Sequence, residues 1–261
     1  MDLGLKGKNA AVTGSSQGMG HGIAMALAAE GCNVAFSARG KDRLGKAVAD
    51  AQALGVKAVG IECDLSTSAG CKKFIDEAVA GLGGLDILVN NVGGMLPGTL
   101  DSITDEQWTV FLNTSLMSYI WSTKYAVPHL KQSKAGRILN VSGVTGRQLT
   151  PGALTTTISN IGIIGFTKQT AAALAPLNVM VNNICPGFTN TESWGPRAEV
   201  MAKVRNVTPD EVRKGIAAQT LLNRWAEPSE IGTVAAFLVS ERNTYMTGTT
   251  VEVDGGFLKH I

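Results

Sequence analysis

The segment that decides the fold is Thr13-Gly14-Ser15-Ser16-Gln17-Gly18-Met19-Gly20, which joins an apolar run at residues 9–12 to a helical pattern at residues 18–30. Glycines in such a turn allow a tight reversal and let backbone N–H groups at the start of the helix approach a phosphate. The helix dipole adds a favourable interaction with negative charge. A turn of this kind is also compatible with an ordinary strand-to-helix connection, but its place after the first strand favours a nucleotide-binding loop.

The remainder of the chain repeats the same change from short apolar runs to helical patterns. Strands are predicted at residues 9–12, 33–37, 57–63, 87–90, 137–141, 179–185 and 249–253, and helices at residues 18–30, 41–54, 68–82, 157–174 and 228–239. Such alternation is typical of parallel strands joined by crossover helices. The predicted fold class is therefore α/β, with residues 1–261 forming a single domain around one Rossmann-type, doubly wound parallel sheet of about seven strands with helices on both faces.

Two more helices are marked by their first residues. Thr104 and Gln107 fit a capping box at the start of a long helix, which is expected to continue until Pro128 disturbs it. Thr208-Pro209 supplies a cap and a proline at the first position of the other helix. The surrounding stretch, about residues 188–220, is predicted to act as a mobile lid over a site, because its first part is long and rich in Thr, Asn, Gly and Pro.

Composition narrows the classes of partner. The 23 basic and 21 acidic side chains nearly cancel, so no overall field draws the chain to nucleic acid or to a membrane surface. No apolar run approaches the roughly 20 residues needed to cross a bilayer. The four cysteines lack C-x-x-C spacing and the three histidines lie far apart, which argues against a metal site or a disulfide framework. The expected protein is cytoplasmic and binds a small molecule, with no metal, nucleic acid or membrane partner.

Further marks lie in register with the glycine-rich loop. They are Asp64 after the third strand, Asn90-Asn91-Val92-Gly93 after the fourth, Asn113 in the long helix, Pro186-Gly187 after the sixth strand, and Asp254-Gly255-Gly256 near the C-terminus. Together with the T-G-x-x-x-G-x-G spacing, they make the chain similar to the short-chain dehydrogenases/reductases over nearly its whole length. The resemblance implies an oxidoreductase with a nicotinamide cofactor, and a homotetramer in which the helices holding Asn113 and Thr156 pack against their symmetry mates.

The resemblance also implies where the cofactor would lie. Asp64 and Leu65 would contact the adenine, and Asn91 and Gly93 would line the cofactor channel beside Val92, which replaces the family's usual alanine. The remaining implied contacts come from the glycine-rich loop and from the end of the sixth strand; they are Gly14, Ser16, Gln17, Gly18, Met19, Gly20, Pro186, Gly187, Thr189 and Thr191.

The end of the second strand indicates which nicotinamide cofactor fits. A carboxylate there binds the ribose 2′-hydroxyl of NAD, whereas an arginine accommodates the 2′-phosphate of NADP. The chain has Arg39 at this place and no acid between residues 36 and 40. NADP(H) is therefore the predicted cofactor, unless Arg39 is only a solvated surface residue.

The proton-handling residues depart from the family's pattern. When residues 140–146 are aligned with the family's S-x-x-G, the serine, tyrosine and lysine positions fall on Gly143, Thr156 and Asn160. A threonine hydroxyl cannot release its proton near pH 7, and an asparagine supplies no cation to assist it. General acid catalysis is typically worth about 10²–10⁴ in rate, so the usual carbonyl reduction is expected to be crippled. The family's Asn113, which helps to hold a water in the proton relay, is retained.

Arg147 offers a substitute, because it leaves the loop at the carboxyl end of the fifth strand, where ligands of such sheets bind. It is a candidate clamp for a carboxylate or an oxyanion, although a plain surface arginine fits the sequence equally well. The candidate catalytic residues are thus Asn113, Arg147, Thr156 and Asn160. Three functions stay open: an NADP(H)-dependent oxidoreductase with a non-standard proton source and a carbonyl, imine or enone-like substrate, a silent NADP(H)-binding sensor or scaffold, and a non-redox lyase or isomerase.

Overall fold

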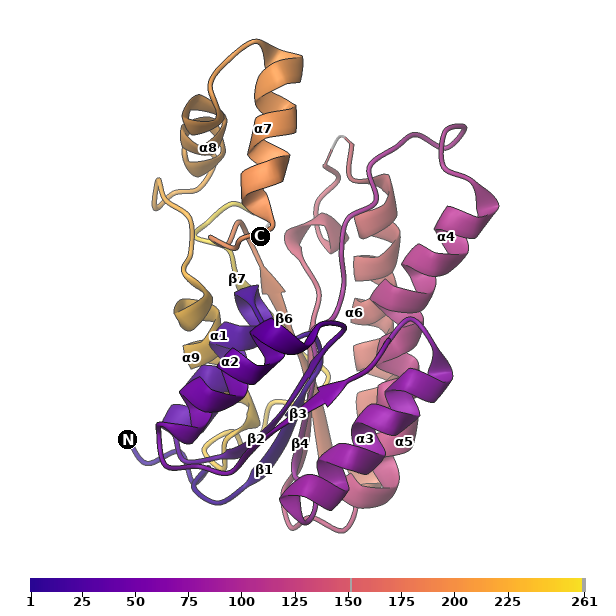
Figure 1. The fold of residues 1–261 in the computed structure, drawn as a ribbon, viewed down its shortest axis with the longest axis vertical. Coiled ribbons are helices and arrows are strands. Elements are labelled where there is room, and N and C mark those ends of the chain that lie inside the picture. The colour runs from indigo at the N-terminus through magenta and orange to yellow at the C-terminus, as the bar shows by residue number, and fades with distance from the viewer. Residues whose placement is uncertain (151, 260–261) are drawn as a thin grey trace.

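The structure of the protein is a computed structural model that describes residues 1–150 and 152–259. Within those residues seven parallel strands pair in the order β3-β2-β1-β4-β5-β6-β7 (Figure 1). Their bounds are β1 (Asn9–Val12), β2 (Asn33–Ala38), β3 (Ala58–Glu62), β4 (Ile87–Asn90), β5 (Gly136–Val141), β6 (Val179–Pro186) and β7 (Thr250–Val253). The predicted doubly wound, Rossmann-type sheet is confirmed.

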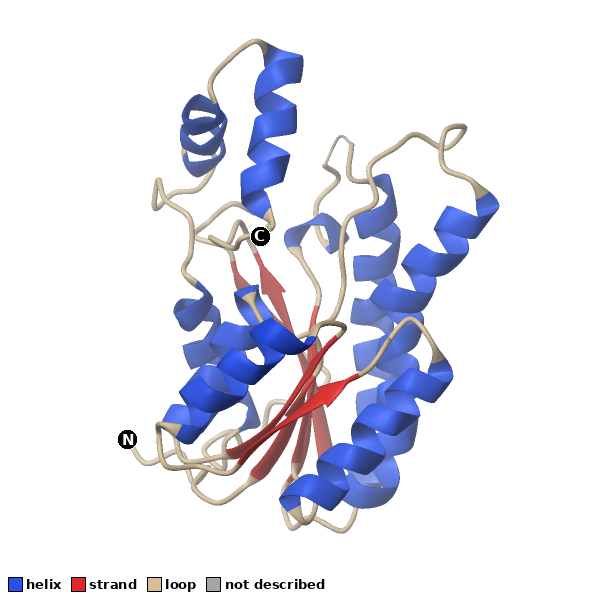
Figure 2. Cartoon of the chain, in the orientation of Figure 1, coloured by secondary structure: helices blue, strands red, loops and turns tan. Residues whose placement is uncertain are grey.

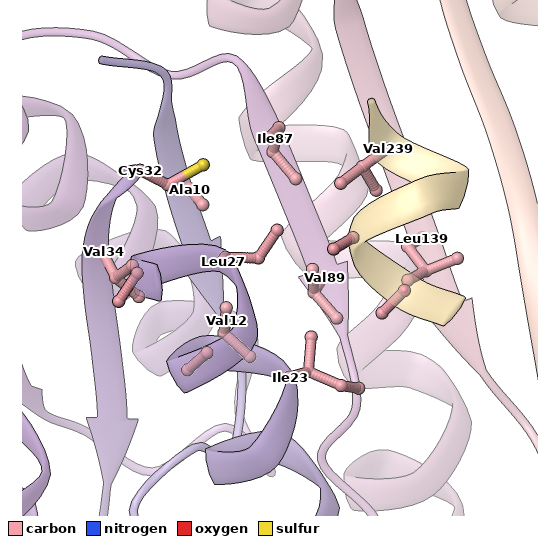
Figure 3. Packing of buried hydrophobic residues seen from close by; sticks show 14 of the residues in the cluster. Ala10, Val12, Ile23, Leu27, Cys32, Val34, Ile87, Val89, Leu139 and Val239 are labelled. Atoms are coloured by element: carbon pink, nitrogen blue, oxygen red, sulfur yellow. The ribbon is translucent and has the colours of Figure 1, made fainter. Parts of the chain in front are cut away.

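Helices cover both faces of this sheet (Figure 2). The first apolar cluster joins one face to α1 (Gly18–Ala29), α2 (Lys41–Gln52) and α9 (Pro228–Val239). The second joins the opposite face to α3 (Ser68–Leu82), α5 (Ser118–Leu130) and α6 (Leu154–Leu174). Because successive side chains of a strand point to opposite faces of the sheet, adjacent residues belong to different clusters. Figure 3 shows this packing, with Ile23 and Leu27 of α1 lying against Val12 and Val89.

The strand order fixes where a ligand can enter. The chain moves outward from β1 to β2 and β3, and then returns to place β4 on the other side of β1. In such sheets the loops after these two central strands separate, and a crevice opens at their carboxyl ends. The loop at residues 13–17 and the loop at residues 91–104 both leave the sheet at this edge.

The long helix differs from its prediction in two details. Thr104 and Gln107 form the expected capping box at α4 (Asp105–Leu112). A π-helical turn at Asn113–Met117 then separates α4 from α5, and Pro128 lies inside α5 rather than ending it. The proline falls in the last turn of α5, where few backbone hydrogen bonds remain to be lost. α6 begins at Leu154, three residues before the predicted start at residue 157.

The stretch predicted as an irregular lid contains a helix that the sequence pattern did not indicate. α7 (Trp194–Arg205) precedes α8 (Pro209–Ala217), whose predicted Thr208 cap and first-turn proline are both present. Ala198 and Ala202 of α7 pack with Val212 and Ile216 of α8 in a small apolar cluster of their own. Packing against α8 stabilises α7, whose first residues, Trp194-Gly195-Pro196, belong to the segment predicted to be irregular. Whether residues 188–220 move as a lid stays a prediction.

Neither a membrane-spanning helix nor a metal site is found among the described residues. None of the described helices combines the length and the apolar composition that a membrane span requires. Among the same residues, no three His, Cys, Asp or Glu side chains gather closely enough to hold a metal ion, and His260 lies outside them. The cytoplasmic location stays a prediction.

Candidate functional site

The glycine-rich loop has a backbone that only glycine adopts easily. Gly14 and Gly18 both have φ +61°. At Gly20, in the first turn of α1, a Cβ would overlap the Asn91 side-chain amide and the Gly14 carbonyl oxygen. A side chain at residue 20 would therefore displace the loop, so the predicted roles of Gly14, Gly18 and Gly20 agree with the space available.

A clasp between β1 and β4 holds this loop. Thr13 Oγ1 accepts hydrogen bonds from the backbone N–H of Asn91 at 2.8 Å and of Val92 at 3.1 Å, and it donates to Val89 O at 3.3 Å. In return, Asn91 Nδ2 donates to Thr13 O at 3.0 Å and to Gly14 O at 3.1 Å. Asn91 thus acts on the loop, while Val92 packs against Gly14. The clasp fixes the two loops that border the crevice.

The start of α1 is open to an anion. Gln17 occupies the N-cap but its side chain makes no capping hydrogen bond, and the first turn of α1 holds no acidic residue. Ser16, Gln17, Gly18 and Met19 are partly exposed. Backbone N–H groups at such a terminus, together with the helix dipole, favour a phosphate.

Two arginines flank the end of β2. Arg39 is exposed, and Arg43 in the first turn of α2 donates to Gln17 Oε1 of the loop. Ser37 Oγ accepts from Gly14 N at 2.9 Å, so the strand end and the loop are tied together. Hydrogen bonds with Ser66 and, to a smaller degree, the charge of Arg39 lower the pKa of Asp64. Asp64 is exposed at the end of β3, and the neighbouring Leu65 is buried.

Gly143 and Asn160 face each other across the end of β5 and α6. A Cβ on Gly143 would lie 3.0 Å from Asn160 Nδ2 and 3.9 Å from Pro186 O. Asn160 Nδ2 donates to Thr145 Oγ1 at 2.8 Å. The structure therefore brings together two of the positions that the alignment singled out, and adds Thr145 as a partner. All three are uncharged.

Thr156 and its neighbours start α6 with their hydroxyls turned to the backbone. Thr156 Oγ1 donates to Ala153 O at 3.1 Å, and the buried Thr155 donates to Leu96 O at 2.8 Å. Ser142 points away from this site, since its hydroxyl donates to Ile184 O at 3.3 Å and accepts from Asn183 Nδ2 at 2.8 Å. Both threonine hydroxyls donate to backbone carbonyl groups, which leaves their lone pairs rather than their protons available.

Asn113 is the first residue of the π-helical turn, an element that is frequent at functional sites. Two residues later, Ser115 is buried, and its hydroxyl has no hydrogen-bond partner within the described chain. That hydroxyl lies 3.8 Å from the place where a Cβ on the exposed Gly93 would be. The π turn therefore presents polar groups toward the loop that follows β4.

The loop after β6 closes the other side of the crevice. Gly187 donates its N–H to Val253 O at 3.0 Å, and a Cβ there would lie 2.8 Å from the Asp254 Cα. Thr189 is buried and bridges to Ala226. Thr191 reaches the glycine-rich loop, where its methyl group lies 3.4 Å from the Cβ position of Gly18. The loop after β6 thus lies next to the glycine-rich loop, and the contacts of these residues with a cofactor stay a prediction.

Arg147 is engaged elsewhere. Its Nε lies 3.3 Å from Glu252 Oε1 of β7, and its side chain lines a cavity of about 610 Å³ with Lys168 and Tyr245. A clamp role would require it to leave this ion pair, so that role stays a prediction.

The tyrosine hydroxyls are likewise placed. Tyr119 OH donates to Val141 O at 2.8 Å in the core, where burial raises its pKa. Tyr125 OH bonds Ser68 at 2.8 Å, and Tyr245 is 98% exposed. None of the described tyrosines has a hydroxyl bonded to Thr145, Thr156 or Asn160.

Sequence reasoning missed Arg43, Thr145 and Arg197. Arg43 had a usable signal, because it follows Arg39 by one helical turn at the start of a predicted helix. The role of Thr145 depends on its hydrogen bond with Asn160, which joins the turn at Val144–Gly146 to α6. Arg197 lies in the unpredicted α7, with its guanidinium 5.4 Å from the centre of the Trp194 ring.

Comparisons with known proteins cover almost the whole chain. A family model described as enoyl-(acyl carrier protein) reductase matches residues 14–258. The 3-oxoacyl-(acyl-carrier-protein) reductase FabG of Staphylococcus epidermidis is 31% identical over 250 residues, covering 95% of this chain and 98% of that protein.

Two solved structures are similar as well. The L-sorbose reductase of Gluconobacter frateurii, solved with NADPH and L-sorbose, has a TM-score of 0.95 and 30% identity, with full coverage of both chains. A short-chain dehydrogenase of Burkholderia cenocepacia in complex with NADP has a TM-score of 0.86 and 29% identity, covering 97% of this chain and 99% of that one.

Proposed function

The chain belongs to the short-chain dehydrogenase/reductase family, and we propose that it is an NADP(H)-dependent oxidoreductase for a small-molecule substrate with a non-standard proton source. The observation that carries this proposal is the set of groups gathered at the carboxyl ends of β1 and β4. There, an uncapped helix start, a clasped glycine-rich loop and two arginines lie along one path. NADP(H), when bound, supplies or accepts the hydride.

The residues of the crevice fit this cofactor. The absence of a Cβ at Gly20 leaves the backbone of the loop accessible, as a pyrophosphate requires. Arg39 and Arg43 suit a 2′-phosphate, since a guanidinium presents a planar set of donors to phosphate oxygens. NADPH in the L-sorbose reductase and NADP in the Burkholderia dehydrogenase support the same choice for this chain.

On the catalytic side, Thr145, Thr156 and Asn160 offer hydrogen bonds but form no ionisable couple. The second Nδ2 hydrogen of Asn160 can donate to a substrate oxygen while the first stays on Thr145. Thr156 can donate only if its hydroxyl leaves Ala153 O. Neither group gives up a proton near pH 7. The suitable substrates are therefore those that need little acid help, namely an iminium, an enone, or a carbonyl activated by its own neighbouring group.

Binding and hydride transfer test the proposal separately. Calorimetric titration with NADPH and NADH should show a preference for NADPH that Arg39→Asp removes or reverses. Incubation with NADPH carrying deuterium at nicotinamide C4 and a panel of ketones, imines and enones should place deuterium in a product. NADPH binding without deuterium transfer to any substrate would favour a silent sensor, and no affinity for either cofactor would refute both functions.

The role of Gly143, Thr156 and Asn160 has its own test. The triple change Gly143→Ser, Thr156→Tyr and Asn160→Lys should introduce weak carbonyl reduction if these residues border the reacting atoms. Gly143→Ser alone should not introduce carbonyl reduction. It adds neither the tyrosine nor the lysine, and its Cβ would lie 3.0 Å from the Asn160 amide nitrogen. Activity of the triple variant no greater than that of the unchanged protein would contradict the assignment.

A silent NADP(H)-binding sensor is the second candidate function. It is favoured by one observation, which is that Thr145, Thr156 and Asn160 bond only to one another or to the backbone. Stereospecific turnover that is lost on changing Thr156 or Asn160 would exclude it.

Self-association is proposed along α6. Ile158 and Ile161 are 43% and 55% exposed, and Gly165 continues the same face one turn later. A helix with apolar residues on its outer face as well as its inner face is usually covered by a partner. A second copy of this chain, as the family resemblance implies, would cover these residues.

A further inference from the structure

Arg197 of α7 is half-buried, and no counter-ion for its guanidinium lies within the described residues. Within the described residues it makes no ion pair and no hydrogen bond. Its guanidinium carbon lies over the Trp194 ring, 5.4 Å from the ring centre. Burial lowers its pKa, and no acidic side chain opposes that effect. An arginine stays charged in proteins, so Arg197 is a partly desolvated cation for which residues 1–150 and 152–259 supply no acidic partner.

Two arginines of the same region, Arg213 and Arg224, have polar partners. Arg213 also lies over a tryptophan, Trp225, at 4.5 Å, but it donates to Asn190 Oδ1 at 2.7 Å. Arg224 forms two hydrogen bonds of 2.7 Å with Glu230. Because Arg213 has the same side chain, the same kind of stacking and the neighbouring helix, it provides a matched comparison for Arg197.

A continuous set of aromatic rings connects Arg197 to the candidate catalytic residues. The Trp194 ring lies 5.7 Å from the Phe188 ring and 4.7 Å from the Trp225 ring, and Phe188 lies 5.1 Å from Phe257. Phe188 also packs in the cluster that contains Val144, the residue next to Gly143. The guanidinium therefore lies at one end of a partly exposed aromatic wall, and the Gly143–Asn160 pair lies near the other.

The segment that carries Arg197 also borders the proposed cofactor path. Just before α7, Thr191 and Glu192 approach the Cβ position of Gly18, at 3.4 Å and 3.7 Å. A ligand that reaches the end of β5 beside the nicotinamide would thus pass along the wall and place its far end near Arg197. Apolar rings with one convergent charged group are the usual composition of a small-molecule site.

We propose that Arg197 binds an anionic group of the substrate, so that the substrate class is a carbonyl-type compound in which an apolar or aromatic segment separates the reacting carbon from a carboxylate or phosphate. This inference rests on the proposed function, because it places the substrate beside NADP(H). Trp194 holds the guanidinium by cation–π contact and leaves its in-plane N–H groups for the anion. The aromatic wall then contacts the apolar segment.

The test uses three probes that share one aryl ketone: 4-oxo-4-phenylbutanoate, its methyl ester, and phenacyl phosphate. Each is titrated calorimetrically into the full-length protein saturated with NADP⁺, and NADPH binding is measured separately on every variant. Charge-assisted hydrogen bonds contribute about 1.5–3 kcal/mol, so at least one anion should bind roughly tenfold to a hundredfold more tightly than the ester. The tighter of the two anions identifies the group as carboxylate or phosphate.

Arg197→Met should remove this preference while leaving NADPH affinity and the melting temperature unchanged, and Arg213→Met should keep it. Arg197→Lys, which retains charge without the planar donors, should keep only part of it. The proposal is overturned if the anions bind no better than the ester, if no anion binds in the presence of NADP⁺, or if Arg197→Met preserves the preference. If the unchanged protein does not bind NADPH, the proposed function is refuted instead.

Discussion

Removing the Thr13 hydroxyl should loosen the loop on which cofactor binding depends. Thr13→Val keeps the shape of a side chain that is 1% exposed, but it removes the acceptor of two backbone N–H groups, those of Asn91 and Val92. The Val89 carbonyl that Thr13 Oγ1 bonds keeps a second donor, the Thr13 backbone N–H at 2.9 Å. The substitution therefore destabilises the protein mainly by leaving two backbone N–H groups without an acceptor, and the Val89 carbonyl contributes little to the change in unfolding free energy.

The size of the effect follows from these contacts. Each buried N–H left without a partner costs about 1–3 kcal/mol, and the part-burial of Asn91 and Val92 favours the lower half, which gives about 2–4 kcal/mol in all. For a domain of this size the melting temperature should fall by roughly 5–15 °C. NADPH affinity should fall with it, because the same residues position Gly14.

Urea denaturation followed by circular dichroism measures the loss of unfolding free energy, and calorimetry measures NADPH affinity. Thr109→Val is the control, since Thr109 is exposed and its hydroxyl makes one bond, to Asp105 O at 2.9 Å. A change within about 0.5 kcal/mol is expected for it. If Thr13→Val loses less than about 1 kcal/mol and binds NADPH as before, the clasp does not hold the loop and the reasoning fails.

Three further changes probe other parts of the structure. Gly20→Ala should weaken NADPH binding at least tenfold in a calorimetric titration, because its Cβ would overlap Asn91 Nδ2; equal affinity would contradict the packing of the loop. Ile161→Glu should reduce the mass measured by size-exclusion chromatography with light scattering, and an unchanged mass would exclude α6 as the contact between copies. The pKa of Glu230 is lowered to about 2 by Arg224, so its stabilising effect is present above the unfolded pKa near 4.3 and is lost as pH falls toward 2. Glu230→Gln should therefore flatten the acid side of the stability curve by less than about 1 kcal/mol, given the exposure of the pair, and an identical curve would show that the ion pair has no net effect.

Local sequence patterns located most elements because their causes are local. Strands β1 and β4 and helices α3 and α9 have the predicted bounds, since apolar periodicity, glycine stops and caps act over a few residues. The π turn at Asn113 and the helix α7 were not predicted. Their conformations depend on packing between segments, which the residues of one segment do not record.

For the site, the sequence located the glycine-rich loop and showed that Arg39 has no acid beside it between residues 36 and 40, because each is a feature of one short segment. It also located Gly143 and Asn160 by alignment, but the Thr145–Asn160 hydrogen bond appears only when β5 and α6 pack together.

By itself, the sequence determined that the chain forms a doubly wound α/β sheet with a phosphate-binding turn after the first strand, because hydrophobic alternation and glycine placement are read along the chain. Only the tertiary structure decided which charged groups meet. It paired Arg147 with Glu252 and placed Arg197 on Trp194, with no carboxylate beside it among the described residues, since strand order and helix packing rather than sequence distance bring these partners together.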